Sequence, residues 1–307
     1  MKIHKEKIAD FDIVFLSFDE PNADENFEDL LRKIPWAKRV HGVKGSDTAH
    51  KACAEISETD RVVIIDGDNI VNKDFINQEV EYEVGSDMSQ TVYSWVAKNH
   101  INGLVYGNGG IKCWPVKLIQ SMKTHENADP LNETAQVDFC WDINYYAQEN
   151  IMSTIYNNST PQQAWRAGFR EGVKMSLASG KRQSKTTLPH SHWKNLNRLY
   201  IWATVGADVE NGMWAIYGAR QGLYKTMCTD WNFVNVRDFE YLNVLWKEIE
   251  ADFDSAAGVF EDVITYGDIL KQELGLSIPI KPLAPDHSAF FKKVYLNPNR
   301  DSDGFIL

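Results

Sequence analysis

Strand-length apolar segments alternate with amphipathic segments over the first part of the chain. Residues 11–18 and 61–66 are largely apolar and rich in β-branched side chains, which is typical of strands buried on both faces of a sheet. Residues 22–34 and 46–56 have apolar positions at helical spacing behind candidate capping residues, and residues 37–43 can form a short strand between them. This βαβαβ order predicts an α/β fold with a doubly wound, mostly parallel sheet.

The later pattern predicts further elements and a helical end to the chain. A strand is expected over residues 88–97, followed by glycine-rich chain over residues 103–114. Helices are expected over residues 116–122, 139–148, 161–175, 193–202, 239–253 and 259–274, with a loop-rich tail from residue 277. Residues 211–222 mix glycine with aromatic residues and favour no single type of element. We therefore predict an α/β domain over residues 1–235 and a C-terminal helical region over residues 236–307.

Composition narrows the class of protein. The chain has 307 residues but no apolar run of the roughly 18–20 residues that a membrane-spanning helix needs, so an integral membrane protein is not expected. No apolar stretch follows the basic residues at the N-terminus, so a secretory signal is not expected either. The four cysteines lie far apart without a CxxC pair, which fits a reducing compartment. The sequence therefore predicts a cytoplasmic protein with no membrane partner.

Charge is unevenly distributed along the chain. The net charge is −11, yet residues 166–198 hold eight basic residues against one acid, Glu171, so this basic segment carries +7 and the rest carries −18. One surface that faces a polyanion would produce this asymmetry, and a solvated polar loop is the alternative interpretation. The candidate DNA contacts in the basic segment are Lys181, Arg182, Lys185 and Lys194.

The strongest local motif is Asp66-Gly67-Asp68, in VVIIDGDNIV. Its two carboxylates follow a predicted buried strand, where open α/β sheets bind ligands, and together they can hold a hard divalent cation. Four Asp-x-Asp triplets occur in the chain, but only this one follows a predicted strand. The motif therefore predicts a metal site at Asp66 and Asp68, with a pair of solvated turn residues as the alternative.

A resemblance to a known family is carried by residues 11–75, which contain FDIVFLSFDEPNADENFEDLLRKIPWAKRVHGVKGSDTAHKACAE and RVVIIDGDN. This part resembles the TET/JBP-associated glycosyltransferases, GT-A-type enzymes largely from phages that are related to the glucosyltransferase making base J. The resemblance continues thinly through GNGGIKCWP and VDFCWD to about residue 222. It implies that the Asp-x-Asp motif binds Mn2+ or Mg2+ and thereby a nucleotide sugar, usually a UDP-sugar. The implied acceptor is 5-hydroxymethylcytosine or 5-hydroxymethyluracil in DNA.

Residues near the other predicted strand ends can complete a nucleotide-sugar site. Asp19 and Glu20 could accept hydrogen bonds from a base or ribose, or could simply complement the next helix. Lys44 precedes a helix whose N-terminus favours phosphate, although an exposed lysine is the alternative. Glycines in YGNGGIKCWP offer bare backbone to a sugar ring, unless they form a tight turn. The donor-binding candidates are Ser17, Asp19, Glu20, Lys44, His50, Asp66, Gly67, Asn108, Gly109 and Gly110.

The resemblance also indicates where a catalytic base and further metal ligands would lie. Inverting GT-A enzymes usually place the base at the start of a helix after the glycine-rich strand, where Asp138 matches better than Asp142. Such folds often add a histidine to the metal, and His190 and His192 would project to one side if they lay on a strand. The alternatives are two acids at a helix N-terminus and two polar loop histidines.

Together these patterns predict a metal-dependent GT-A glycosyltransferase, in the host cytoplasm if phage-encoded, whose basic segment faces DNA. The enzyme would move a hexose or pentose from a nucleotide sugar to a hydroxymethylated pyrimidine, with inversion at the anomeric carbon. One alternative is a haloacid-dehalogenase-like phosphatase, because a buried strand ending in Asp-x-Asp also carries its nucleophile; here Asn69-Ile70 replaces the usual Thr or Val. The other is a non-catalytic phage DNA-binding protein.

Overall fold

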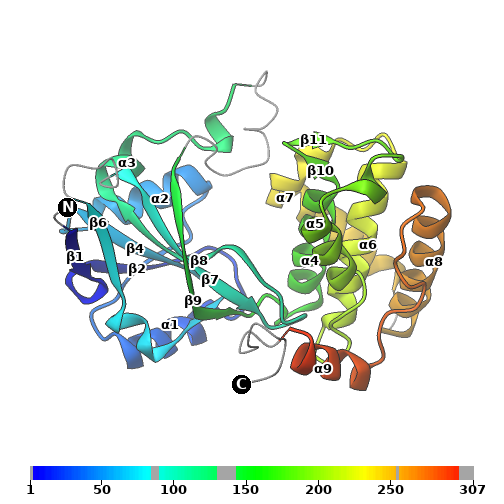
Figure 1. Cartoon of the computed structure of the whole chain (residues 1–307), viewed down its shortest axis with the longest axis horizontal. Coiled ribbons are helices and arrows are strands. Elements are labelled where there is room, and N and C mark those ends of the chain that lie inside the picture. The colour runs from blue at the N-terminus through cyan, green and yellow to red at the C-terminus, as the bar shows by residue number, and fades with distance from the viewer. Residues whose placement is uncertain (1–2, 84–89, 130–142, 254–255, 297–307) are drawn as a thin grey trace. The chain divides into compact units, whose positions relative to one another are not determined.

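The computed structural model describes residues 3–83, 90–129, 143–253 and 256–296, which divide into two compact units (Figure 1). The described part of unit 1 lies within residues 3–100, 105–129 and 143–156, and that of unit 2 within residues 101–104 and 157–296. The main division thus falls between residues 156 and 157, and not between residues 235 and 236. The reason is that apolar residues after 235 share a core with those of residues 161–175.

Unit 1 is built on a mixed sheet. Its described strands are β2 (Asp12–Ser17), β3 (Lys38–His41), β4 (Arg61–Asp66), β5 (Asn69–Val71), β7 (Val92–Asn99), β8 (Val105–Pro115) and β9 (Tyr145–Ile155). They lie in the order β3-β2-β4-β8-β7-β9-β5. The pairs β2–β3, β2–β4 and β7–β9 are parallel, while β4–β8, β7–β8 and β5–β9 are antiparallel. A separate antiparallel pair joins β1 (Ile3–Lys7) to β6 (Glu79–Glu83). The predicted α/β class is confirmed. Parallel pairing, which the sequence predicted for most of the sheet, is found in β3–β2–β4 and between β7 and β9.

Helices cover both faces of this sheet. α1 (Ala23–Lys33) packs on one face, where Phe15 and Ile65 share a buried core with Leu30. α2 (Ser46–Glu55) and α3 (Val116–Ser121) pack on the other, where Val14 shares a core with Cys53. Because successive strand residues point to opposite faces, a strand covered on both sides must be apolar at every position. This doubly wound arrangement explains the continuous apolar runs of β2 and β4.

Two elements differ from the local prediction. The sequence predicted a helix over residues 139–148, but the described residues from Tyr145 onward form β9, which pairs in parallel with β7 and antiparallel with β5. The hydrogen-bonding partners of β9 come from distant segments, so no local pattern announces the strand. In the tail that was expected to be loop-rich, Pro285 begins helix α9 (Pro285–Val294) at a position where proline fits the first turn.

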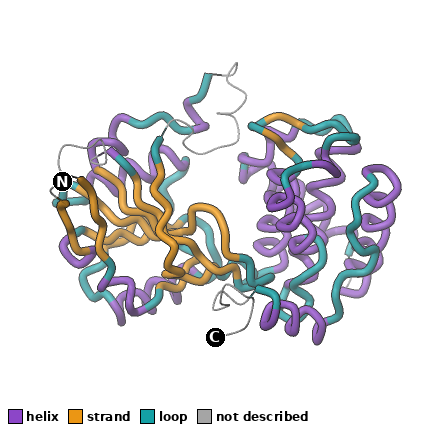
Figure 2. The backbone as a smooth tube through the Cα atoms, viewed as in Figure 1, coloured by secondary structure: helices purple, strands orange, loops and turns teal. Residues whose placement is uncertain are grey.

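Unit 2 is mainly helical, whereas the long strands gather in unit 1 (Figure 2). Its elements are α4 (Pro161–Met175), the hairpin β10 (Leu177–Ala178) and β11 (Lys181–Arg182), α5 (Trp193–Trp202), α6 (Gly212–Cys228), α7 (Phe239–Asp252), α8 (Ala256–Leu274) and α9. Trp165 of α4, Tyr217 of α6 and Trp246 of α7 belong to one buried aromatic core. Across the described ranges, no helix has the length and apolar character needed to cross a membrane.

α4 and α6 pack with their backbones in close contact. A Cβ added to Gly168 would lie 1.9 Å from the Ala215 carbonyl oxygen, and one added to Gly218 would lie 2.1 Å from that of Trp165. Gly172 and Gly222 make equivalent approaches one turn further along. Only residues without side chains permit this distance between helices. The mixture of glycine and aromatic residues over 211–222 therefore belongs to one helix, with Gly218 and Gly222 against α4 and Tyr217 in the aromatic core.

Arg220 of α6 is fully buried and donates to four backbone carbonyls. Its Nε lies 2.9 Å from Ala203 O, its Nη1 lies 2.7 Å from Val263 O and 2.6 Å from Ile280 O, and its Nη2 lies 2.9 Å from Pro279 O. Burial lowers the pKa of the guanidinium to about 10, so the group is still charged at neutral pH. Arg220 thus connects α6 with α8 and with the segment that follows α8.

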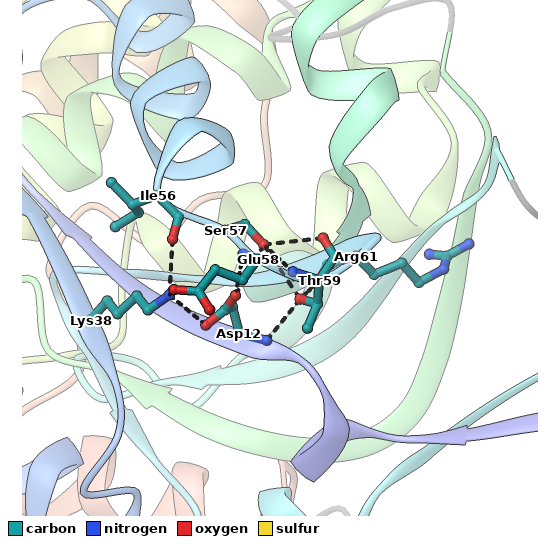
Figure 3. Close-up of polar contacts among 7 residues, drawn as sticks. All are labelled: Asp12, Lys38, Ile56, Ser57, Glu58, Thr59 and Arg61. Carbon is teal, nitrogen blue, oxygen red and sulfur yellow. Dashed lines mark hydrogen bonds and ion pairs between the residues drawn. The ribbon is translucent and has the colours of Figure 1, made fainter.

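A network of hydrogen bonds and ion pairs joins the amino ends of β2 and β3 to the segment between α2 and β4 (Figure 3). Asp12 Oδ1 lies 2.8 Å from Lys38 Nζ, and Asp12 Oδ2 accepts the backbone N–H of Glu58 at 2.5 Å. The Asp12 N–H donates to Thr59 Oγ1 at 3.0 Å, and Lys38 Nζ donates to Ile56 O at 2.9 Å. Burial alone would raise the pKa of Asp12, but the hydrogen bonds from Lys38 and Glu58 outweigh it and lower that pKa. The network fixes the strand ends opposite those that carry the Asp-Gly-Asp motif.

We expect Asp12→Asn to reduce the free energy of unfolding by about 1–2 kcal/mol at pH 7, because a charge-assisted hydrogen bond is lost. The folded-state pKa of Asp12 lies below its unfolded value, so its contribution is present above about pH 4 and is lost as the pH falls further. Thermal melting at pH 7 and pH 3 should therefore show a difference between wild type and variant that shrinks in acid. The exposed Asp10 supplies the control Asp10→Asn, which should leave melting unchanged. A difference independent of pH would contradict the ionic role.

Candidate carboxylate site at the strand ends

Carboxylates gather at the carboxyl ends of β2 and β4. Ser17 ends β2 and Glu20 lies three residues later, while Asp66 ends β4 and Asp68 follows. Gly67 lies beneath Glu20: a Cβ on Gly67 would be 2.8 Å from Glu20 Oε2 and 2.9 Å from Ser17 Cβ. The missing side chain therefore lets Glu20 approach the Asp-Gly-Asp turn. We call Glu20, Asp66 and Asp68 the carboxylate site.

The carboxylate site concentrates negative charge. Burial raises the pKa of Asp68 to about 7, and the nearby charges of Asp66 and Glu20 add to the rise. Burial also raises the pKa of Glu20, as do Asp19 and Asp66, while the N–H of Phe18, 2.8 Å from Glu20 Oε2, acts in the opposite direction. The Asp66 side chain is 46% exposed and so faces solvent. A cation that reached this site would relieve the repulsion among its carboxylates.

We expect Asp68→Asn to stabilise unit 1 at alkaline pH in the presence of a chelator. The folded-state pKa of about 7 lies above the unfolded value, so wild-type stability falls as the pH rises from about 4 through 7. Asparagine keeps the shape without the charge, and should raise the free energy of unfolding by about 1–3 kcal/mol at pH 8 and by little at pH 5. Melting curves with EDTA at both pH values test this. A variant that is equally destabilised at both pH values would show that the Asp68 charge is already compensated.

Asn69, which the sequence analysis did not assign to the site, holds Asp68 in place. It is 1% exposed, and its Nδ2 donates to Asp68 Oδ1 at 2.7 Å. Its Oδ1 in turn accepts from the Ser153 hydroxyl of β9 at 2.7 Å. Gly110 makes room for this amide, because a Cβ on Gly110 would lie 2.1 Å from Asn69 Nδ2. The signal in the sequence that could have identified Asn69 was its position as a polar residue between Asp68 and the apolar pair Ile70-Val71.

Lys112 is a second residue that the sequence analysis missed. It lies opposite Ile64 in the antiparallel pairing of β8 with β4, and its Nζ reaches to 3.9 Å from Asp66 Oδ2 and 2.8 Å from Gly109 O. Its side chain is 18% exposed. A lone lysine between Ile111 and Cys113, in a strand that is otherwise apolar there, was the signal that could have identified it.

His50 was predicted to contact the donor, and the structure places it on the same face of the sheet as Lys112. Its ring meets Trp114 of β8 edge-on, with 5.7 Å between ring centroids. Its Nδ1 lies 2.8 Å from Ser46 O, which fits an N–H donor at Nδ1. Burial lowers the pKa of His50 despite the nearby charge of Asp66, so the imidazole is neutral at pH 7.

The N-terminus of α2, where the sequence predicted a phosphate, holds a carboxylate from the chain itself. Glu126 accepts the N–H of Ser46 at 2.6 Å and that of Asp47 at 3.2 Å. Gly45 precedes the helix with a φ of +90°, and a Cβ there would lie 3.2 Å from Glu126 Oε2. Lys44, the predicted diphosphate contact, is exposed beside this turn. The anion preference of the helix end is thus real, and Glu126 satisfies it.

The remaining donor candidates of unit 1 lie around the carboxylate site. Asp19 is exposed, whereas Ser17 is buried, with its Oγ 2.9 Å from His41 Nδ1. Gly109 lies in a bulge of β8. Between the paired residues Trp95–Ile111 and Ala97–Tyr106, β8 spans five residues while β7 spans only two, so the extra residues of β8 bulge out of the pairing. A Cβ on Gly109 would lie 2.3 Å from Trp95 O, so packing against β7 already requires this glycine. The side chain of the candidate Asn108 lies outside the described part of the structure.

The donor set fits a hard divalent cation. Asp66 and Asp68 supply carboxylate oxygens at a charge-rich strand end, and Mg2+ or Mn2+ commonly completes its coordination with water and phosphate oxygens. Among the described residues, no group of three or more His, Cys, Asp or Glu side chains is arranged to hold a metal ion by itself. A cation here would therefore need ligands beyond these protein side chains.

The predicted histidine ligands do not lie on a strand. His190 ends a short 3₁₀ turn and His192 is the N-cap of α5, where its Nδ1 accepts the N–H of Lys194 at 3.3 Å. Both are exposed and belong to unit 2, whereas Asp66 and Asp68 belong to unit 1. The premise that an extended strand aligns the two rings is therefore wrong, and their role as metal ligands stays a prediction.

Two groups of predicted residues remain. The candidate bases Asp138 and Asp142 lie outside the described residues. Within the basic segment, Arg182 donates to Thr229 O and Trp231 O at 3.1 and 2.5 Å, and Lys185 pairs with Glu273 at 2.7 Å. Lys181 and Lys194, like Arg182 and Lys185, are exposed. The basic segment is thus a folded part of unit 2, running from α4 through the hairpin to α5, rather than a long solvated loop.

Comparison of the sequence with models of known protein families gives no match, and comparison with curated proteins gives no significant match.

Proposed function

We propose that the chain is a metal-dependent glycosyltransferase of the GT-A type that moves a sugar from a nucleotide-sugar donor to a hydroxymethylated pyrimidine in DNA. The observation that carries the proposal is the carboxylate site: an Asp-Gly-Asp turn at the carboxyl end of a central strand, beside Glu20 and flanked by Lys112. Ligands of open α/β sheets bind at this edge. The resemblance over residues 11–75 supplies the reaction, the donor and the acceptor.

Each residue of the site has a distinct task in this reaction. Asp66 and Asp68 would hold a divalent cation, which when bound offsets the charge of the departing nucleoside diphosphate. Asn69 fixes the rotamer of Asp68 through its 2.7 Å hydrogen bond. The Lys112 ammonium lies 3.9 Å from Asp66, where it can also attract phosphate oxygens. Glu20, which follows the neighbouring strand, can accept hydrogen bonds from the donor's ribose or base.

The acceptor part of the proposal is supported by charge. The basic segment carries +7 in a chain of net charge −11, and its lysines 181, 185 and 194 are exposed on unit 2. Neutralising DNA phosphates is the task for which such a local excess of positive charge is suited. The hydroxymethyl group must lose a proton as it attacks the sugar, and Asp138, followed by Asp142, remains the proposed base.

A direct assay tests the proposal. The protein is incubated with Mn2+, DNA containing 5-hydroxymethylcytosine or 5-hydroxymethyluracil, and a panel of nucleotide sugars, and the digested nucleosides are weighed by mass spectrometry. We expect one hexose or pentose to be added to one modified base, with no product on unmodified DNA or in EDTA. No mass gain with any donor would overturn the proposal. Release of phosphate from a chromogenic ester would instead favour the phosphatase alternative.

A further inference from the structure

Trp193 is a strongly exposed aromatic residue at the first position of α5. Its surface is 66% accessible, more than that of any other large apolar residue among those described. The His192 ring is stacked beside it, with 6.0 Å between centroids and 30° between ring planes. Lys194 Nζ lies 5.7 Å from the centre of the Trp193 ring. The indole is thus presented to solvent between a cation and a second flat ring.

The chain around Trp193 is held in place. Two leucines anchor it in a core of unit 2, where both are fully buried. Leu188 precedes α5, and Leu199 lies within it. The Ser191 hydroxyl donates to Gln183 Oε1 at 2.7 Å, which ties the start of α5 to the residue after β11. The exposed ring is therefore held at a defined position on the surface of unit 2.

The surroundings of Trp193 indicate the chemistry of that ligand. Lys181, Arg182, Lys185, Lys194 and Arg198 lie in the same stretch of chain, and residues 172–207 contain no Asp or Glu. The Gln183–Ser191 hydrogen bond brings the hairpin that carries Lys181 and Arg182 to the start of α5. A surface that binds a protein or a lipid usually presents a broad apolar patch, whereas this one presents a single exposed ring among cations. It is typical of single-stranded nucleic acid, in which phosphates meet cations and bases stack on aromatic rings.

We propose that Trp193 is a stacking platform for an unpaired base of the DNA acceptor strand. The inference rests on the proposed function, since an enzyme acting on a base inside a duplex must expose that base or its neighbours. The base stacks on the exposed indole, and Lys181 and Lys194 contact the adjoining phosphates. Stacking is tolerant of base identity, so Trp193 contributes affinity for the strand rather than recognition of one sequence.

The test uses fluorescence anisotropy of labelled single-stranded and duplex oligonucleotides with the full chain over a range of salt concentrations. Trp193→Ala should weaken binding of the single strand by about 10- to 100-fold at every salt concentration, because stacking involves no counterion release. Trp193→Phe should keep most of the affinity. Lys181→Ser with Lys194→Ser should instead flatten the log–log salt dependence by about one to two units. Trp36, 50% exposed on unit 1, supplies the control Trp36→Ala, which should bind like wild type.

The outcomes separate the inference from the function on which it rests. If wild type transfers sugar and binds DNA, but Trp193→Ala binds the single strand with the same affinity as Trp36→Ala, the inference is overturned and the proposed function stays intact. Wild type that binds neither single-stranded nor duplex DNA overturns both. An altered salt slope for Trp193→Ala would show that the loss comes from displaced lysines, which also overturns the stacking role.

Discussion

Replacing Asp68 with alanine is expected to abolish metal-dependent binding of a nucleoside diphosphate. Asp68 is one of two carboxylates placed at the end of β4, and Asn69 and Ser153 hold it there through successive 2.7 Å hydrogen bonds. Loss of a residue that merely orients a metal ligand typically weakens metal binding 10- to 100-fold, so loss of a ligand itself should weaken it by at least roughly 100-fold. The fold should survive, because the side chain lies beyond the strand.

Calorimetry with Mn2+ and nucleoside diphosphates measures this effect directly. Wild type should release or absorb heat only when both are present, and Asp68→Ala should give no signal at the same concentrations. Asp10→Ala, in the Asp-x-Asp triplet at the opposite end of β2, is the matched control and should bind like wild type. If Asp68→Ala bound the metal and the diphosphate with unchanged affinity, the metal site could not lie at Asp68, and the proposed reaction would lose its main support.

The second large effect is expected for Gly218→Ala, which should destabilise unit 2 by about 3 kcal/mol, at the upper end of the usual range for overpacking. The new Cβ would stand 2.1 Å from Trp165 O and 2.9 Å from Phe169 N, so α4 and α6 would have to move apart. The same movement would loosen the aromatic core that Trp165 and Phe169 share with Trp246. On an unhindered helix the substitution would stabilise by about 1 kcal/mol, so the sign of the change identifies close helix packing.

Thermal unfolding followed by circular dichroism should show the transition of unit 2 lowered by roughly 10 °C. Lys225→Ala, on the same helix at a half-buried position, controls for changes in helix propensity and should shift melting little. Gly168→Ala should resemble Gly218→Ala, because its Cβ would meet Ala215 O at 1.9 Å. A melting temperature at or above that of wild type would mean that the helices can separate without cost.

The sequence predicted elements well where local pattern and tertiary role agree. The apolar runs and helical stripes of residues 11–66 gave β2, α1, β3, α2 and β4 in order, and the helix bounds of α4 and α5 were predicted to the residue. The pattern failed for β9, whose buried and exposed positions do not alternate and whose partners β7 and β5 are distant in sequence. Pairing between remote segments, rather than propensity, determines that strand.

The same distinction applies to the carboxylate site. Asp66, Asp68 and Glu20 could be found because parallel strands end at a common edge, so their positions follow from the strand bounds alone. Lys112 was missed because its approach to Asp66 depends on the antiparallel register of β8 against β4, which the sequence does not specify. Glu126 was missed for a related reason: it caps α2 from a segment about 80 residues away. Hydrogen bonds between such remote segments have no local signature.

Arg220 also constrains the order in which unit 2 can be completed. Two of its four carbonyl acceptors, on Pro279 and Ile280, lie about 60 residues downstream and therefore leave the ribosome well after α6 itself. Until they arrive, the guanidinium must stay hydrated, and the space it fills between α6 and α8 cannot close. The packing of α6 against α8 can thus be completed only after residues 279 and 280 have left the ribosome. A released chain truncated after residue 275 should accordingly be cleaved by protease within unit 2, and a released chain ending at residue 296 should resist.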